Sequence, residues 1–213
     1  MSNRLVIITG ASGGIGKCVK DILLSRGHQV INLTRSPTLS EDMFMDLSSY
    51  QSVLSGLKKL KLLVNLSDYI FINNAACINP VKPLAESSPS EIMDSVNTNV
   101  CSPLLMFNFF ERLKRPWDLV NLTSGASNSV NPHLGLYSSG KLFIDRFLIF
   151  LQSEKSYCRK FISHDPGICN TAIHRELKSS PYFTNDSFNS TTPKRPIDAA
   201  QYLINRLEFD ELI

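Results

Sequence analysis

The fold is decided by the stretch RLVIITGASGGIGKCVKDILLSR, which runs from Arg4 to Arg26. Its first part, up to Thr9, is an apolar run of the length and character of a strand that is buried on both faces. A cluster of glycines then breaks the run. The helical spacing that follows is set by Ile15, Val19, Ile22 and Leu23. The stretch therefore predicts a strand, a tight glycine turn and a helix.

The rest of the chain repeats these two patterns in alternation. Further strands are predicted at 29–34, 43–47, 68–73, 118–123 and 159–163, and further helices at 50–63, 90–115, 135–152 and 196–207. Short apolar strands joined by helices are typical of a parallel sheet that is covered on both faces. The predicted fold class is therefore α/β, a Rossmann-type doubly wound parallel sheet with helices on both faces.

Length and composition predict one globular domain over residues 1–213. With 43% hydrophobic and 19% charged side chains, the chain can bury one sizeable core. The one loop-like stretch, 178–194, is rich in Ser, Asn, Thr and Pro, and we expect it to be a mobile substrate loop. The net charge is only +3 and the basic residues are scattered, which argues against nucleic-acid binding.

The sequence also bears on compartment and metals. The five cysteines are odd in number and lack metal-ligand spacing, which argues against a disulfide framework and a metal site. No window approaches the ~18 apolar residues of a membrane span. The expected location is the reducing cytoplasm, with no membrane partner.

The glycine turn carries the first chemical signal. It reads TGASGGIG from Thr9 to Gly16 and lies where a strand meets a helix. Glycines there let a pyrophosphate approach the backbone, and the helix N-terminus offers unpaired N–H groups and a positive dipole end. The string fits both T-G-x-x-x-G-x-G and T-G-x-x-G-x-x-G, which mark different branches of nucleotide-binding enzymes. The predicted cofactor-binding residues are Gly10, Ser12, Gly13, Gly14, Ile15 and Gly16.

The end of the second predicted strand indicates which cofactor is bound. Dinucleotide folds that prefer NAD commonly carry a carboxylate here for the ribose 2′-hydroxyl, whereas this chain has Arg35. A planar guanidinium suits a 2′-phosphate. NADP(H) is therefore the predicted cofactor, with NAD(H) disfavoured. The alternative is a surface arginine that touches nothing.

A third signal combines Ser124 with Tyr137 and Lys141. Tyrosine and lysine four residues apart share one helix face, about 6 Å apart along the axis. An unperturbed tyrosine has a pKa of about 10, so a nearby cation that favours the phenolate moves it toward acid–base chemistry. Ser124 is predicted at the carboxyl end of a parallel strand, the edge at which doubly wound sheets bind ligands.

Taken together, these motifs resemble the short-chain dehydrogenase/reductase family, single-domain type. The resemblance runs from Thr9 to about Leu207. It rests on five motifs in order: the glycine turn, Asp46-Leu47, the NNAA run at 73–76, Ser124 with Tyr137 and Lys141, and Pro166-Gly167 with Thr171. Within the family, the stretches 99–106 and 166–176 look most like the sepiapterin reductase and benzil reductase group.

The resemblance implies a role for each matching residue. Tyr137 would be the general acid that protonates a carbonyl oxygen, and Ser124 would hydrogen-bond that oxygen. Lys141 would bind the nicotinamide ribose and lower the tyrosine pKa. Asn99 would hold a water in a proton relay, with Asn97 as the competing register. The other cofactor positions implied are Asp46, Leu47, Asn73, Ala75, Tyr137, Lys141, Pro166, Gly167, Ile168 and Thr171.

The chain also departs from the family pattern. Unusual residues for the family are Thr123, Ala76 and Asp165. Gly13 stands where many NADP-preferring relatives carry a basic residue, so Arg35 would bind a 2′-phosphate with less help. The segment 208–213 ends where relatives continue into a last strand, so we expect the final C-terminal strand of the sheet to be missing.

Two predicted helical stretches, 103–115 and 142–151, are apolar around too much of their circumference for one buried face. In the family these two helices form the dimer interface, so a homodimer or homotetramer is expected. The alternative is that neighbouring helices of the same chain cover them.

The sequence thus predicts an oxidoreductase that transfers hydride from NADPH to a ketone or dicarbonyl small molecule, with Tyr137 as general acid and no metal. The alternative is a catalytically silent NAD(P)-binding sensor or scaffold. A nucleotide-sugar epimerase or dehydratase also uses Y-x-x-x-K, but the chain after Lys141 is short for the separate substrate domain of such enzymes.

Overall fold

The computed structural model describes residues 4–64 and 68–209 of the chain. Within them, parallel strands form one sheet: β1 (Leu5–Thr9), β2 (Gln29–Thr34), β3 (Asp42–Phe44), β4 (Tyr69–Asn73), β5 (Trp117–Leu122) and β6 (Cys158–His164). Their order across the sheet is β3-β2-β1-β4-β5-β6, so the chain starts in the middle and builds outward in both directions. This order confirms the doubly wound α/β fold class.

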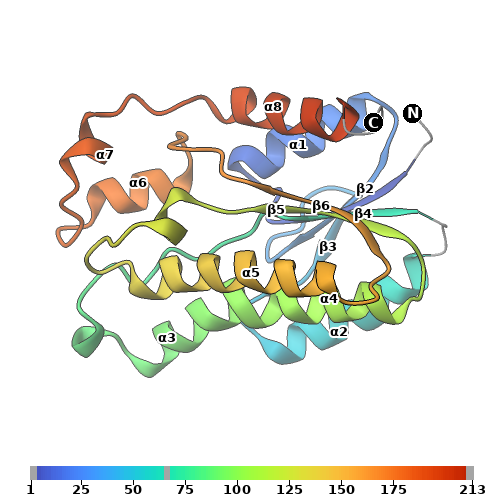
Figure 1. Ribbon diagram of the computed structural model, residues 1–213, viewed down its shortest axis with the longest axis horizontal. Helices are drawn as coiled ribbons and strands as arrows, with labels where there is room; N and C mark the ends of the chain where they lie inside the picture. Colours follow the sequence, from blue (N-terminus) through green and yellow to red (C-terminus); the bar gives the residue numbers. More distant parts are fainter. Residues whose placement is uncertain (1–3, 65–67, 210–213) are drawn as a thin grey trace.

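Helices cover both faces of the sheet (Figure 1). One face carries α1 (Gly14–Ser25) and α8 (Pro196–Phe209) side by side, and the other carries α2 (Tyr50–Leu63), α4 (Ser102–Arg112) and α5 (Gly135–Ser153). The helix α3 (Pro89–Val96) runs into α4 through η2 (Asn97–Cys101), a single π-helical turn. The chain also forms two 3-10 turns, η1 (Leu84–Glu86) and η3 (Gly125–Asn128), and η3 packs against α5.

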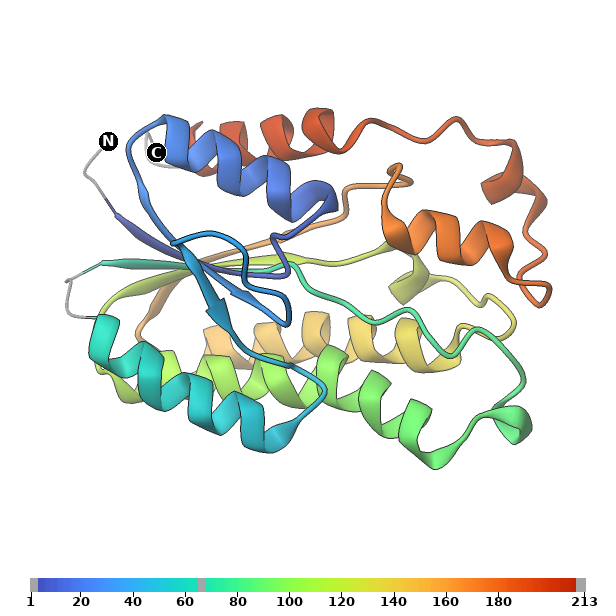
Figure 2. The same cartoon turned by 180° about the vertical axis from the view of Figure 1, so that it is seen from behind.

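Two short helices, α6 (Ala172–Ser179) and α7 (Asp186–Ser190), lie together at one end of the molecule, beyond the carboxyl ends of the strands (Figures 1 and 2). Of the helices in the described ranges, none is both long and apolar enough to span a membrane.

The central strand β1 serves both faces of the sheet in alternation. Leu5 and Ile7 pack in the layer of α2, α4 and α5, whereas Val6 and Ile8 pack against α1 and α8. Because both faces are buried, the strand needs apolar side chains at every position and reads as one continuous apolar run. This is why the strand could be recognised from the sequence.

Most predicted boundaries agree with the structure within two residues, and three predictions need correction. The strand predicted at 43–47 ends at Phe44, because 46–49 form a turn in which the Ser49 amide donates to the Asp46 carbonyl oxygen (3.2 Å). The single helix predicted over 90–115 is divided by η2 and ends at Arg112. The stretch 178–194 is not without regular structure, since it contains the end of α6 and all of α7.

The edges of the sheet are β3 and β6 in the part of the chain that the structure describes. These six strands are the ones that the sequence predicts. The expectation that a final strand is missing was based on the segment 208–213, and residues 210–213 lie outside the described residues.

Candidate active site

The predicted site residues meet at one edge of the sheet. The glycine turn follows β1, the NNAA run begins at the last residue of β4, Ser124 follows β5, and Pro166-Gly167 follows β6. All of these strands are parallel, so their carboxyl ends share one edge. Doubly wound sheets bind ligands at this edge.

The glycine turn is pressed tightly against the residues that follow β4. Gly10 has a φ of +70°, and a Cβ there would come within 2.9 Å of the Ala75 Cβ. At Gly16 a Cβ would come within 2.4 Å of the Asn74 Nδ2 atom. Real Cβ atoms do not approach so closely, so the turn requires glycine at both positions.

Asn74 is a site residue that was not among the predicted ones. Its Nδ2 donates to the carbonyl oxygens of Thr9 (2.8 Å) and Gly10 (3.1 Å). In return, the Thr9 hydroxyl accepts hydrogen bonds from the amides of Asn74 (3.1 Å) and Ala75 (3.0 Å). These four bonds lock the glycine turn to β4. The NNAA run was a visible signal, but the sequence does not say which asparagine turns back to the glycines.

The N-terminus of α1 is open and fits an anionic group. Gly13 is its N-cap, no side chain caps it, and its first turn has no acidic residue. A Cβ at Gly13 would meet no protein atom within 4 Å. Uncapped amides and the positive end of a helix dipole are the groups that bind a pyrophosphate in dinucleotide folds. The Ser12 hydroxyl shares a hydrogen bond with the Thr34 hydroxyl (2.7 Å), which ties the turn to the end of β2.

Arg35 follows β2 at the same edge of the sheet. Its side chain is exposed and has neither an ion pair nor a hydrogen bond among the described residues. A guanidinium that no carboxylate neutralises is available to pair with phosphate oxygens.

The helix α5 places Tyr137 and Lys141 one turn apart, and they are only 7% and 6% exposed. The Lys141 Nζ atom lies 5.8 Å from the centroid of the Tyr137 ring and donates to the Leu122 carbonyl oxygen (2.7 Å). Ser124, two residues after Leu122, hydrogen-bonds the Tyr137 side chain. The structure thus brings the three predicted residues together at the end of β5.

Burial governs the protonation of this set. It raises the pKa of Tyr137, a hydrogen bond from Ser124 partly lowers it, and the Asp165 carboxylate raises it further. Burial lowers the pKa of Lys141 to about 8, against the influence of Asp145. At neutral pH the phenol therefore keeps its proton and most of the lysine is charged. The sequence predicts a lowered tyrosine pKa; that direction is wrong, because desolvation by burial raises the pKa of Tyr137.

Asn99 and Asn97 point to different parts of the molecule. Asn99 is buried, and its side chain accepts from the Cys77 amide (2.9 Å) and donates to the Cys77 carbonyl oxygen (2.7 Å). A Cβ at Gly140 would lie 3.0 Å from the Asn99 Cβ, so η2 packs against α5 beside Lys141. Asn97 instead donates to the Ser48 carbonyl oxygen (2.8 Å). Of the two registers, Asn99 is the one that lies next to α5.

Three predicted cofactor positions have side chains with structural partners. The Asp46 carboxylate accepts from the amide (3.0 Å) and the hydroxyl (2.9 Å) of Ser48. Leu47 is buried in the core under α4. The Asn73 Nδ2 donates to the Asn121 Oδ1 (2.8 Å). These residues lie at the edge of the site, and their side chains pack against or hydrogen-bond other parts of the protein.

The loop after β6 crosses the N-terminus of α1. Gly167 donates its amide to Asp165 (2.9 Å), and the Ile168 carbonyl oxygen accepts from the Lys194 amide (2.9 Å). Thr171 caps α6, and its methyl group would lie 3.3 Å from a Cβ at Gly14. Thr171, at the end of this run, therefore lies beside the glycine turn.

An apolar cluster that no sequence pattern predicts encloses Tyr137. Its members are Ile78, Val81, Leu134, Tyr137, Leu177 and Phe183, with Ala76, Ala126, Ile173 and Phe188 packed against them. Residues 172–190, from the start of α6 to the end of α7, supply several of these side chains, and we call this segment the α6–α7 cover. Hydrogen bonds from Ser180 to the Val81 carbonyl oxygen (3.1 Å) and from Asn185 to Asn131 (2.9 Å) attach it to the rest.

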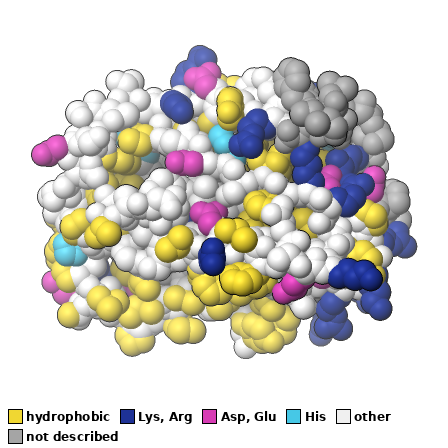
Figure 3. Space-filling view, in the orientation of Figure 1, with side chains coloured by type: hydrophobic (Ala, Val, Ile, Leu, Met, Phe, Trp, Pro, Cys, Tyr) yellow, Lys and Arg dark blue, Asp and Glu magenta, His cyan; other side chains and the backbone are white. Residues whose placement is uncertain are grey.

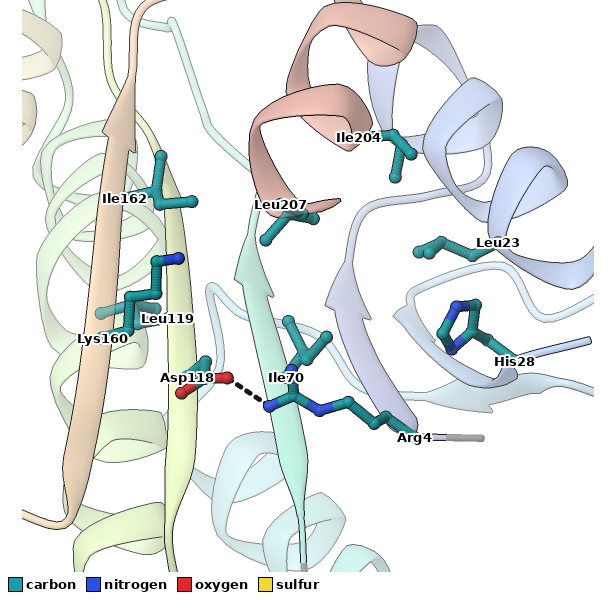
Figure 4. Close-up of a pocket in the computed structure, with 10 residues that line it drawn as sticks. All are labelled: Arg4, Leu23, His28, Ile70, Asp118, Leu119, Lys160, Ile162, Ile204 and Leu207. Carbon is teal, nitrogen blue, oxygen red and sulfur yellow. Dashed lines mark hydrogen bonds and ion pairs between the residues drawn. The ribbon is translucent and has the colours of Figure 1, made fainter. Parts of the chain in front are cut away.

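A separate small cavity lies at the opposite end of the strands (Figure 4). It is lined by Leu23, Ile70 and other apolar side chains, and Arg4 pairs with Asp118 at its rim. None of the predicted site residues lines it. The described ranges also contain no group of three or more His, Cys, Asp or Glu that could hold a metal ion.

The fold and this site define a dinucleotide-binding oxidoreductase. The family model for short chain dehydrogenases matches residues 4–181, and the chain belongs to that family, whose members bind a nicotinamide cofactor. Benzil reductase ((S)-benzoin forming) of Bacillus subtilis is 30% identical, over 83% of this chain and 79% of the relative. The protein of the same name from Bacillus cereus is 25% identical, over 98% of this chain and 95% of that relative. These relatives confirm the resemblance to the benzil reductase group.

Further similarities point the same way. The NADPH-dependent pterin aldehyde reductase of Arabidopsis thaliana is 25% identical over 95% of this chain and 88% of that protein. Among solved structures, the KRED1-Pglu enzyme has a TM-score of 0.78 at 16% identity, over 94% of this chain and 92% of that one. A short chain dehydrogenase from Burkholderia cenocepacia in complex with NADP has a TM-score of 0.74 at 21% identity, over 97% of this chain and 84% of that one. The structural matches show the shared fold.

Proposed function

We propose that this protein is an NADPH-dependent carbonyl reductase that acts on a ketone or dicarbonyl small molecule. The observation that carries the proposal is the buried pair of Tyr137 and Lys141, with the half-buried Ser124 beside Tyr137, at the same sheet edge as the open N-terminus of α1. The names of the benzil reductases and of the pterin aldehyde reductase support it.

Each residue of the set has a defined task. When bound, the reduced nicotinamide supplies a hydride to the carbonyl carbon. Ser124 donates a hydrogen bond to the carbonyl oxygen, and Tyr137, whose raised pKa keeps its proton in place at neutral pH, protonates that oxygen. The ammonium of Lys141 stabilises the phenolate that is left. Asn99, against the same turn of α5, is the proposed anchor of a water that resupplies the proton.

The residues proposed to hold the cofactor are those of the sheet edge. The amides of the glycine turn and of α1 would bind the pyrophosphate, Lys141 the nicotinamide ribose, and Arg35 the 2′-phosphate. The NADPH-dependent relative and the NADP-bound structural neighbour support NADP(H) over NAD(H).

The α6–α7 cover indicates the character of the substrate. It presents Leu177, Phe183 and Phe188 around Tyr137, and the rings of Phe183 and Phe188 meet edge to face at 5.0 Å. Such a lining favours an apolar, aromatic carbonyl compound over a charged one.

We propose further that the protein is a homodimer built on α5. On this helix, Leu142, Phe143 and Phe150 are 49%, 46% and 53% exposed. The ring of Phe147 stacks on that of Phe143. Hydrophobic side chains gather along the same side of the molecule in Figure 3, below the sheet. An apolar surface of this kind is typical of an interface. The five free cysteines suit a reducing compartment, for which we propose the cytoplasm.

The test is turnover with each cofactor. Purified protein is mixed with benzil, a vicinal dicarbonyl, and either NADPH or NADH, and loss of the reduced cofactor is followed by absorbance. We expect the protein to oxidise NADPH. The Arg35→Ala variant should bind NADPH roughly tenfold or more weakly, because a charge-assisted hydrogen bond contributes about 1.5–3 kcal/mol, and its affinity for NADH should not change. Lys58→Ala, an exposed change on α2, is the matched control. Binding of NADPH without turnover of any dicarbonyl would instead support the silent sensor.

A further inference from the structure

Asp145 lies on α5, one turn after Lys141, and no motif assigns it a role. Its Oδ1 accepts hydrogen bonds from Asn121 Nδ2 (3.1 Å) and Ser163 Oγ (2.9 Å), and its Oδ2 accepts one from the Thr123 hydroxyl. The donors come from β5, from the residue that follows it, and from β6. One carboxylate thus fastens the catalytic helix to two strands at the active-site edge.

The hydrogen-bond network continues toward the cofactor side. The Asn121 Oδ1 accepts from Asn73 Nδ2 (2.8 Å), and both asparagines are buried. Buried polar networks whose members are all paired make a site rigid. Thr123, which donates to Asp145, directly precedes Ser124, so the network reaches the main chain that carries the catalytic serine.

Asp145 is also the charge that acts on Lys141. Burial lowers the pKa of Lys141 to about 8, and the Asp145 carboxylate opposes that shift. The other carboxylate that acts on the pair is Asp165, from the loop after β6, and it acts on Tyr137. The Lys141 ammonium donates to an uncharged group, the Leu122 carbonyl oxygen of β5, and the neighbouring Gly140 packs against the uncharged Asn99 of η2.

We propose that Asp145 is a positioning residue, which holds α5 against the ends of β5 and β6 and keeps the Lys141 ammonium charged. This inference rests on the proposed function, because the charge matters only if Tyr137 gives up a proton. Asp145 acts through Lys141 and Thr123 and touches no reacting atom.

Asp145→Asn separates charge from hydrogen bonding. The amide oxygen can still accept from Asn121 and Ser163, and the amide nitrogen can donate to the Thr123 hydroxyl, because a hydroxyl both donates and accepts. Ser163→Ala is the matched control, since it removes one hydrogen bond and keeps the charge. Asp145→Ser, which leaves room for a bridging water, repeats the test if the asparagine variant does not fold.

The readout is the titration of Lys141 itself, followed by NMR of carbon-13-labelled lysine and assigned by the signal lost in Lys141→Arg. We expect Asp145→Asn to lower the titration midpoint by about one pH unit, since removing a nearby opposite charge disfavours the ammonium. The alkaline limb of the kcat profile should move equally. Ser163→Ala should lower the Tm and leave the midpoint in place.

An unmoved midpoint in Asp145→Asn, or an equal shift in Ser163→Ala, would overturn the inference. The NMR titration needs no turnover. An inactive wild-type protein would therefore refute the proposed function and would leave the result for Asp145 readable.

Discussion

The cofactor side and the substrate side of the site are held together differently. On the cofactor side, the site is held by close approach of the backbone and by hydrogen bonds to main-chain groups. A Cβ at Gly16 would clash with Asn74, and the Thr9 hydroxyl accepts hydrogen bonds from two main-chain amides. On the substrate side, the α6–α7 cover relies on its apolar cluster and on side-chain bonds such as that from Tyr182 to Glu86 (2.7 Å). A backbone-built pocket suits a constant ligand, whereas a cover built from side chains can be changed without disturbing the sheet.

The largest effect is expected where the two sides meet, at Tyr137. Tyr137→Phe removes the general acid and should lower turnover roughly 10²- to 10⁴-fold, while NADPH binding is kept because the glycine turn is untouched. Absorbance assays measure turnover, and fluorescence titration measures NADPH affinity. Tyr50→Phe, an exposed change on α2, should match the wild type. Near-normal turnover of Tyr137→Phe would remove the basis of the mechanism.

The next effect tests the rigidity of the cofactor side. Gly16→Ala forces a Cβ onto Asn74 and should lower the free energy of unfolding by about 1–3 kcal/mol, as overpacking does, and weaken NADPH binding. Gly135→Ala, whose Cβ would meet no atom within 4 Å, is the control. Urea unfolding and cofactor titration measure both quantities. Equal stability of the two variants would show that the turn tolerates a side chain.

A third test uses Asp42, which holds the loop that carries Arg35. Burial alone would raise the pKa of Asp42, but hydrogen bonds from Thr38, Asn32 and Leu39 outweigh it and bring the pKa from 3.8 to about 2. Since the folded value lies below the unfolded one, this stabilisation is present above about pH 4 and is lost as the pH falls toward 2.

The loss of unfolding free energy expected from Asp42 is about 2 kcal/mol, and the total loss should be smaller by this amount in Asp42→Asn. Unfolding in urea at pH 5 and pH 2.5 measures it. Glu154→Gln, at an exposed position, should keep the wild-type dependence. A wild-type slope in Asp42→Asn would contradict the assignment.

The smallest effect is expected on the substrate side. Phe188→Ala removes an aromatic ring from the cover and should raise the KM for benzil about tenfold, since losing buried apolar area of this size weakens binding by one to a few kcal/mol. The Kd for NADPH should not change. Phe44→Ala, on the exposed side of β3, is the control. A changed affinity for NADPH with an unchanged KM for benzil would show that Phe188 belongs to the cofactor side and not to the substrate side.

The cofactor side was also easier to predict from the sequence than the substrate side. The strands, the glycine turn and the Tyr137–Lys141 pair depend on local periodicity and turn geometry, so the doubly wound fold was predicted correctly and these residues lie at one edge. The substrate loop predicted at 178–194 overlaps the cover, but the helices and contacts of the cover were not predicted, because they join distant segments, as Ser180 with Val81 and Asn185 with Asn131.

Asp145 also went unrecognised, since its partners lie on two strands. The one local signal was its position, four residues after Lys141 on the same helix face.

The central claim is that this chain transfers hydride to a carbonyl carbon. The most direct measurement uses NADPH deuterated on either face of its hydride-bearing carbon, benzil as substrate, and mass spectrometry of the product. The account predicts an alcohol with one deuterium on the reduced carbon from one labelled cofactor and not the other, and roughly 10²- to 10⁴-fold slower product formation with Tyr137→Phe. NADPH that binds and stays unoxidised, with no alcohol formed, would contradict it.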